Sequence, residues 1–343
     1  MGRGATVIVA GAGALGLTTA LALADAGCAV TVCDPAPETA NASGVAAGML
    51  APVFESVLDA EGPDALTLLL AARDLWPGLA QRAGVALDRS GAVAVGSEAW
   101  LAKVRARLSQ LGLYGTDLGR GTLETLAPGL AGDFGIGVMT REDWRVDPRQ
   151  ALEALRRAAV EAGVGFRTEA VARRGDADWL VAAAGAAHGL APELAFLTPI
   201  KGQILRFADR RGGGMSLRGE GAYAVPGPGG LAVGATMEPG LTDTGVDPVA
   251  IRPLVEAAGR LFPDLAGATF HASAGVRGAT PDGLPMVGAA SAPGVLVAAG
   301  ARRNGWLLAP LVAQIIAACV TGRDPGPYAA RFDPQRFEPG RVR

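Results

Sequence analysis

A glycine-rich segment near the N-terminus has the residue types and spacing that bind a dinucleotide. Gly11, Gly13 and Gly16 form the pattern G-x-G-x-x-G, which follows a β-branched run and opens an Ala/Leu-rich run. The first glycine permits a tight turn, the second lets the backbone approach a pyrophosphate, and the third allows close contact between helix and strand. The amides at the start of the following helix would face the phosphates.

An acidic residue stands where such a site needs one. Asp34 ends the next β-branched run, close to the spacing of about 20 residues that dinucleotide-binding units show. Its carboxylate would accept hydrogen bonds from ribose hydroxyls and repel a 2′-phosphate. Because the chain has 50 glycines, a chance match that binds nothing is the alternative, but the position between a strand and a helix favours a binding site. The pattern does not distinguish NAD from FAD.

The rest of the composition leaves the chemistry to a cofactor. The histidines are His188 and His271 alone, which disfavours a multi-His metal site or a His-centred relay. The cysteines, Cys28, Cys33 and Cys319, form no C-x-x-C pair, which favours a reducing cytoplasm. A bound cofactor is the natural source of reactivity.

Charge and hydropathy exclude other classes. The net charge of −2 means that the chain has no excess of positive charge to neutralise a phosphate backbone, so we expect no nucleic-acid partner. Half of the residues are hydrophobic, which excludes a disordered chain. The longest apolar stretch, residues 306–320, is shorter than the roughly 20 residues of a membrane span, so it predicts a buried helix.

Strands and helices alternate at both ends of the chain and enclose a strand-rich middle. We expect strands at 6–10, 29–33, 91–95, 180–184, 204–207, 231–233 and 295–299. We expect helices at 14–25, 63–83 with an interruption at Trp76-Pro77, 98–111, 149–162, 249–262 and 306–320. The pattern predicts an α/β fold, α+β overall, in which a Rossmann-like domain carries an inserted, mainly antiparallel substrate domain. The expected division is 1–84, 145–192 and 270–343 for the first domain, and 85–144 and 193–269 for the second.

Four blocks resemble the D-amino-acid oxidase superfamily of FAD-dependent oxidoreductases, and within it the glycine oxidases of thiamine biosynthesis. They are ASGVAAGMLAP at 42–52, PIKGQ at 199–203, RGATPDGLP at 277–285 and RNGWLLAP at 303–310. The blocks keep the family's order, so the resemblance spans nearly the whole chain. It implies that the first domain binds FAD.

The resemblance also implies which residues hold the flavin, non-covalently because no Cys lies in a known attachment motif. FAD would lie along the glycine pattern, with contacts from Ala14, Leu15, Asp34, Ala42, Ser43, Ala47, Gly48, Met49, Val171, Ala301, Arg302, Arg303, Asn304, Gly305, Trp306 and Leu307. Asp34 would hold the adenosine ribose, and the backbone of Val171 would meet adenine, with plain strand packing as its alternative. The last helix would point its positive end at the place where reduced flavin gathers negative charge.

For the substrate, the resemblance singles out four residues. Arg277 would grip an α-carboxylate with two parallel hydrogen bonds, and Arg303 would meet the same amino acid or orient its loop. Tyr223 and Met237 match residues of the substrate pocket. The plain alternatives are a salt bridge for Arg277 and ordinary core positions for Tyr223 and Met237.

This chain also departs from the glycine oxidase pattern. Ala301 and Arg302 stand where His-Tyr is common, and Gly221 stands where a pocket His is often found. Arg302 would either admit a more acidic substrate or point to solvent.

The resemblance implies oxidative deamination of glycine, sarcosine or a D-amino acid to an imino or keto acid, with O2 reduced to H2O2, in thiamine biosynthesis. The expected partners are a small amino acid and O2, in the cytoplasm, with homo-oligomerisation left open. One alternative is a dehydrogenase of D-amino or N-methyl amino acids that uses a quinone or a protein acceptor. Another is a flavin-binding subunit of a larger complex. A tRNA-modifying oxidase is disfavoured by the charge and by the lack of a partner domain in this sequence.

Overall fold

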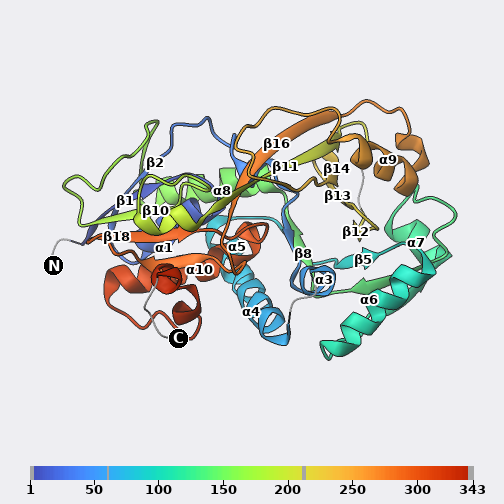
Figure 1. Ribbon diagram of the computed structural model, residues 1–343, viewed down its shortest axis with the longest axis horizontal. Helices are drawn as coiled ribbons and strands as arrows, with labels where there is room; N and C mark the ends of the chain where they lie inside the picture. The colour runs from blue at the N-terminus through green and yellow to red at the C-terminus, as the bar shows by residue number, and fades with distance from the viewer. Residues whose placement is uncertain (1–3, 60–61, 211–213, 339–343) are drawn as a thin grey trace.

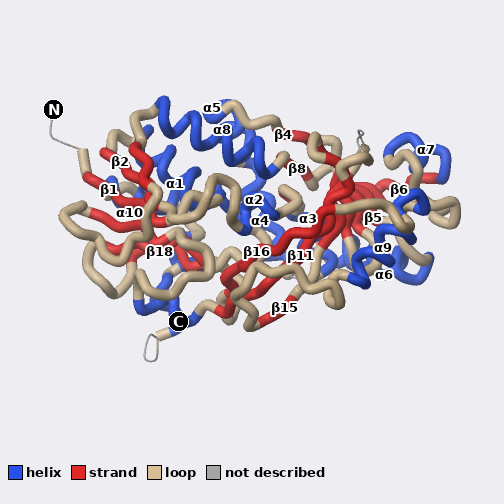
Figure 2. Tube along the Cα trace, turned by 90° about the horizontal axis from the view of Figure 1, so that it is seen from above, coloured by secondary structure: helices blue, strands red, loops and turns tan. Residues whose placement is uncertain are grey.

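Two large sheets lie at opposite ends of an elongated molecule (Figures 1 and 2). The protein is described by a computed structural model that covers residues 4–59, 62–210 and 214–338. One end is the α/β unit expected for the Rossmann-like domain, and the other is built mainly of antiparallel strands. The predicted fold class is confirmed.

The first sheet has six strands in the order β17-β18-β10-β1-β2-β9. Their bounds are β1 Thr6–Ala10, β2 Ala29–Cys33, β9 Gly165–Arg167, β10 Trp179–Ala182, β17 Met286–Ala289 and β18 Val295–Ala299. All neighbours are parallel except the pair of β17 and β18. From β1 the chain first adds strands on one side and then returns to β10 on the other. The carboxyl ends of β1 and β10 therefore flank the crevice where such sheets bind ligands.

Two apolar helices contact this sheet, and a third, amphipathic helix packs on the first of them. Helix α1 (Ala14–Asp25) packs against both α8 (Pro148–Glu161) and α10 (Gly305–Thr321). Ten of the residues from Trp306 to Ile316 of α10 are buried, since neighbouring elements surround the helix. Among the described residues, no helix has both the length and the hydrophobicity to cross a membrane.

The second sheet has nine strands. They are β5 Ala92–Ala94, β6 Thr116–Gly119, β7 Ile136–Thr140, β11 Thr198–Phe207, β12 Ser216–Arg218, β13 Tyr223–Gly227, β14 Gly230–Gly234, β15 Glu238–Pro239 and β16 His271–Ala279. Only β5 and β12 pair in parallel. Strand β16 pairs with β11 along its whole length, although it lies in a segment that the sequence assigns to the first domain. The expected domain boundaries stay a prediction.

The remaining elements connect or cover the two sheets. A small sheet joins β3 (Met49–Leu50), β8 (Trp144–Val146) and β4 (Leu87–Asp88). The other helices are α2 Ala42–Val45, α3 Pro52–Leu58, α4 Pro63–Asp74, α5 Trp76–Ala83, α6 Glu98–Gln110, α7 Arg120–Leu126 and α9 Arg252–Leu261. Four 3₁₀ turns complete the fold: η1 Pro192–Phe196, η2 Pro263–Leu265, η3 Ala329–Phe332 and η4 Pro334–Phe337.

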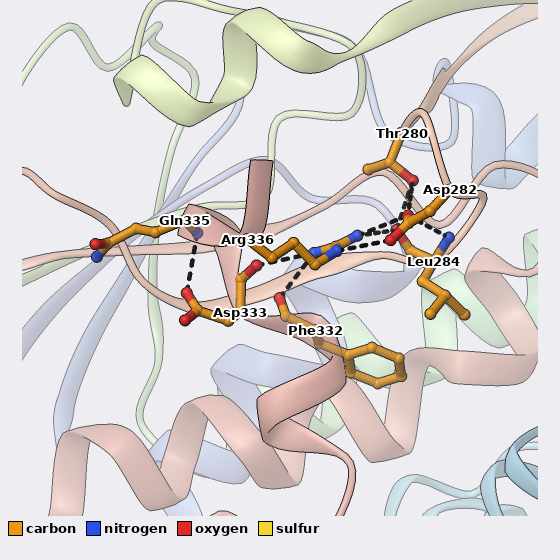
Figure 3. Close-up of polar contacts among 7 residues, drawn as sticks. All are labelled: Thr280, Asp282, Leu284, Phe332, Asp333, Gln335 and Arg336. Atoms are coloured by element: carbon orange, nitrogen blue, oxygen red, sulfur yellow. Dashed lines mark hydrogen bonds and ion pairs between the residues drawn. The ribbon is translucent and has the colours of Figure 1, made fainter. Parts of the chain in front are cut away.

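The C-terminal turn η4 holds the loop that follows β16 (Figure 3). Arg336 donates to both carboxylate oxygens of Asp282, at 2.8 and 2.9 Å, and to the Leu284 carbonyl at 2.7 Å. The Thr280 hydroxyl donates to the same carbonyl at 2.6 Å. This clip fixes the exit of the strand that carries Arg277.

Asp282→Asn is expected to destabilise the fold by about 1.5–3 kcal/mol at neutral pH, because it removes a charged hydrogen-bond acceptor. Burial alone would raise the pKa of Asp282, but the hydrogen bonds and charge of Arg336 hold it below its usual value. The carboxylate therefore contributes stability above the unfolded-state pKa, and that contribution is lost as pH falls through the lower folded-state pKa. Urea unfolding should show that the difference in free energy of unfolding between wild type and variant becomes smaller in acid. Asp133→Asn, at an exposed site, is the control. An equal loss of unfolding free energy in both variants would contradict the stabilising role of the Arg336–Asp282 contact.

Candidate active site

Two neighbouring cavities that share lining residues lie beside the second sheet. The larger, here called the cleft, measures about 1170 Å³ and runs from Gly11 and Asp34 to Arg302. The smaller, here called the pocket, measures about 360 Å³ and reaches Arg277 and Tyr223. Both are lined by Ala42, Ser43, Val45, Gly275, Arg277, Arg302 and Gly305. The arrangement suits an elongated cofactor with a substrate at one end.

The glycine turn at the start of the cleft depends on close backbone contacts. Gly11 has a φ of +111°, and a Cβ there would lie 2.4 Å from the Ala183 carbonyl oxygen. A Cβ on Gly16 would lie 1.9 Å from the Gly11 oxygen. Gly16 lines neither cavity, so it contributes packing of helix on strand rather than a surface for a ligand.

Asp34 and Ser43 bind the backbone on both sides of this turn. One Asp34 oxygen accepts from the Ala12 amide at 2.7 Å, and the other accepts from the Ala36 amide at 2.9 Å. Ser43 Oγ accepts from the Ala14 amide, the first of α1, at 3.0 Å. Each carboxylate oxygen has a second lone pair. Asp34 can thus position the turn and accept a ribose hydroxyl at once.

Asp34→Ala is expected to weaken FAD binding by about 1–3 kcal/mol, or roughly 5- to 150-fold, the worth of a charged hydrogen bond. Titration of apoprotein with FAD measures the change. Asp176→Ala, at an exposed site that lines neither cavity, should bind FAD as wild type does. Equal affinity of the Asp34 variant and this control would place Asp34 outside the FAD site.

Helix α10 begins where the cleft and the pocket meet. Its first residue, Gly305, lines both cavities, and Asn304 makes no side-chain cap bond within the described part of the chain. The first amides of a helix have no carbonyl partner in that helix, so the positive end of α10 lies at the junction. Trp306 holds it there, because its indole nitrogen donates to the Ser43 carbonyl at 3.1 Å.

Arg277 extends from β16 into the pocket. Its Nη2 donates to the Thr236 carbonyl at 3.2 Å, and no carboxylate pairs with it among the residues that the structure describes. Burial lowers the pKa of Arg277, as do the charges of Arg303 and Arg302. A Cβ on Gly202 would lie 1.8 Å from Nη2, which explains the glycine in the PIKGQ block. The guanidinium is a partly buried cation with unused donors.

Tyr223 and Met237 lie in the same pocket. Burial raises the pKa of Tyr223, so its phenol is a neutral hydrogen-bond donor. A Cβ on Gly234, the cross-strand partner of Tyr223, would lie 2.5 Å from the phenol oxygen. Met237 lines the pocket while 40% exposed, so it borders the opening rather than the core.

Arg303 is held by acidic side chains that the sequence analysis missed. It pairs with Glu55 at 2.5 Å and with Asp59; Glu55 lies within α3, and Asp59 directly follows this helix. Glu55 also pairs with the buried Arg218. Burial alone would raise the pKa of Glu55, but Arg218 and Arg303 hold it below its usual value. A signal was present: Glu55 is a lone charge inside the apolar run 51–58.

A second buried acid supports α3. Asp143 accepts from the amides of Val53 and Phe54 at 2.8 and 3.1 Å. Burial raises the pKa of Asp143 to about 7. It fixes the helix that carries Glu55 and Asp59.

The other predicted cofactor residues also gather around these cavities. The cleft is lined by Gly11, Gly13, Ala14, Leu15, Asp34, Ala42, Ser43, Val171, Ala301, Arg302 and Gly305. The pocket is lined by Ala47, Gly48, Met49, Arg303, Asn304 and Trp306, besides the residues already described. Leu307 lines neither; its carbonyl accepts from the Trp76 indole at 3.3 Å. Their contacts with a flavin stay a prediction.

These residues fit FAD. The cleft offers glycine backbone for a pyrophosphate, a carboxylate for ribose, and the positive end of α10 near the pocket, where a flavin ring would stack beside a substrate. No group of three or more His, Cys, Asp or Glu side chains in the described residues could hold a metal ion.

Comparisons with known proteins agree with this geometry. A family model described as FAD dependent oxidoreductase, DAO, matches residues 6–319. A protein named glycine oxidase from Pseudomonas putida is 29% identical over 94% of this chain and 97% of its own length. A bifunctional protein named ThiO/ThiG from Trichormus variabilis is 30% identical over 97% of this chain, which spans 55% of that relative. The crystal structure of glycine oxidase from Geobacillus kaustophilus superposes with a TM-score of 0.83 at 26% identity, covering 97% and 99% of the two chains.

Proposed function

Since the chain belongs to the DAO family of FAD-dependent oxidoreductases, we propose that it oxidises the amine of a small amino acid. The product would be an imino acid, which water hydrolyses to a keto acid and ammonia. The names of its glycine oxidase and ThiO/ThiG relatives support an amino-acid substrate and a role in thiamine biosynthesis.

The observation that carries this proposal is Arg277. A partly buried guanidinium without an internal carboxylate is desolvated at some cost unless a ligand supplies the anion. Its planar donors match the two oxygens of an α-carboxylate. Tyr223, in the same pocket, can donate a further hydrogen bond. Together they would fix the amino acid and leave its α-carbon in a set orientation.

The charges of the pocket favour a neutral amine. Arg218, Arg277, Arg302 and Arg303 line it, and these cations disfavour an ammonium group. Glu55, the one acid among its described lining residues, is held by two arginines and is not free to take a proton. The amine would therefore lose its proton to water, and its lone pair would then assist the departure of hydride from the α-carbon.

When bound, FAD supplies the two-electron chemistry, accepting the hydride and passing the electrons to O2 to give H2O2. Asp34, the turn after β1 and the start of α10 would hold it. The amino acid and O2 are the proposed partners, and the cytoplasm is the proposed location.

Release of flavin by acid precipitation and a peroxide assay test the proposal. Purified protein should be yellow, and acid should release FAD into the supernatant. Peroxide should then form with at least one of glycine, sarcosine or a panel of D-amino acids. Substrate-dependent reduction of a quinone or dye without peroxide would support a dehydrogenase instead. A colourless protein that binds NAD and refuses FAD would overturn the assignment.

A further inference from the structure

The pocket holds more positive charge than one carboxylate neutralises. Its described lining includes four arginines and one acid, Glu55. Asp59, just outside the lining, contributes a second negative charge through its pair with Arg303. Two cations remain in excess of these two acids. Asp143 also interacts with one of the four arginines, but burial raises the pKa of Asp143 to about 7, so it is only partly charged at neutral pH. The α-carboxylate of an amino acid would offset one of the two excess cations, at Arg277.

The second excess charge belongs to Arg302. Asp59 pairs closely with Arg303, and Glu55 pairs closely with Arg218. Arg302, in contrast, lies 3.9 Å from Asp59, near the upper limit for an ion pair. Arg302 lines both the cleft and the pocket, and its side chain is 33% exposed. It is therefore a weakly neutralised guanidinium at the junction of the two cavities.

The backbone of Arg302 has an unusual conformation. Arg302 has a φ of +50°, a conformation that side-chain-bearing residues rarely adopt and that glycine or asparagine would adopt more readily. Its amide donates to the Gly278 carbonyl at 3.0 Å, one residue after Arg277. The charge of Arg302 also lowers the pKa of Arg277, so the two guanidinium groups share one electrostatic environment.

The pocket has room for more than a glycine-sized substrate. Gly221 lines it, and a Cβ built on Gly221 meets no described atom within 4 Å. Gly221 is itself exposed, so this open space lies at the edge of the pocket, which measures about 360 Å³. The pocket therefore combines free volume with positive charge that no described acidic side chain fully neutralises.

We infer that the preferred substrate is an amine with two carboxylates, one bound by Arg277 and the second by Arg302. The inference rests on the proposed amino-acid oxidation and adds a substrate class to it. Arg302 acts here as a specificity-determining residue, because a second carboxylate would be its charge partner. Arg303, already held by two acids, is not available for that role.

Binding of acids that cannot be oxidised tests this directly. Diglycolate carries two carboxylates, and methoxyacetate is its counterpart with one. Each is titrated into the holoenzyme, and the change in protein fluorescence or flavin absorbance gives Kd. We expect wild type to bind diglycolate at least about tenfold more tightly, the effect of one charged hydrogen bond.

Removing the charge should abolish that preference. Arg302→Asn, which suits the positive φ, should weaken diglycolate binding roughly tenfold or more and change methoxyacetate binding less than about threefold. Arg302→Gly is the second variant, and Arg302→Lys should restore part of the preference. Arg323→Asn makes the same charge change at an exposed position that lines neither cavity, and should bind both acids as wild type does.

Two results would overturn the inference: equal wild-type affinity for the two acids, or equal losses for both acids in Arg302→Asn. The wild-type comparison decides the point even if a variant fails to fold. A protein that oxidises glycine but shows no preference for diglycolate would refute the inference and keep the proposed function. A protein that prefers diglycolate but oxidises no amine would refute the proposed function and keep the two-carboxylate site.

Discussion

Arg277→Ala is expected to lower kcat/KM for an amino acid by roughly 30- to several-thousand-fold. Truncating one partner of a buried, hydrogen-bonded charge pair costs about 2–5 kcal/mol, and each 1.36 kcal/mol is a factor of ten. The FAD content should be unchanged, because the lost partner is the substrate. Stopped-flow reduction of the flavin by the amino acid measures the effect.

Two comparisons make this result specific. Arg277→Lys should recover little of the activity that Arg277→Ala loses, because a point charge cannot supply the planar pair of donors. The Arg277→Ala variant should lose much less activity toward amines without a carboxylate than toward amino acids. If Arg277→Ala reduces its flavin with the wild-type rate and half-saturation, the anchor lies elsewhere, and Arg302 becomes the next candidate.

Glu55→Gln is expected to destabilise the protein by about 3–5 kcal/mol, the effect of breaking a buried ion pair while leaving its partner charged. Glu55 and Arg218 have side chains 8% and 7% exposed, so water cannot replace the lost contact. Arg303 would lose a partner as well. Urea denaturation of the apoproteins measures the change.

The matched control is Glu124→Gln. Glu124 pairs with Arg120 on the surface of α7, with 60% of its side chain exposed, and such pairs contribute about 0–1 kcal/mol. A Glu55 variant as stable as this control would show that the Glu55 cluster is not a structural centre of the pocket.

The parts of the fold that depend on local pattern could be predicted from the sequence. The strand, glycine turn and helix of residues 6–25 carry their signals within a few residues of one another, and the structure matches them. The same holds for the interruption at Trp76, where α4 gives way to α5. Arg277 carries no local signal of this kind, and only the resemblance of its block to a family pointed to a substrate role.

Contacts between distant segments could not be predicted. Glu55 and Arg218 are 163 positions apart, and their pairing depends on how α3 packs beside β12. The same Glu55 also pairs with Arg303, an arginine expected to meet the substrate. The clip of Arg336 and Asp282 is also non-local, spanning 54 positions. The charged side chains of the pocket come from the second sheet, from α3 and from the loop before α10, so the balance of their charges depends on the tertiary fold.

Anaerobic mixing of the holoenzyme with amino acids tests the central claim most directly. We predict that an amino acid within the panel of glycine, sarcosine, D-amino acids and dicarboxylic amines bleaches the visible absorbance of the flavin. The α-imino or keto acid should form in equal amount, and admitting O2 should restore the colour with one H2O2 per flavin. Flavin that stays oxidised with every member of the panel, in protein that holds FAD fully, would contradict the assignment.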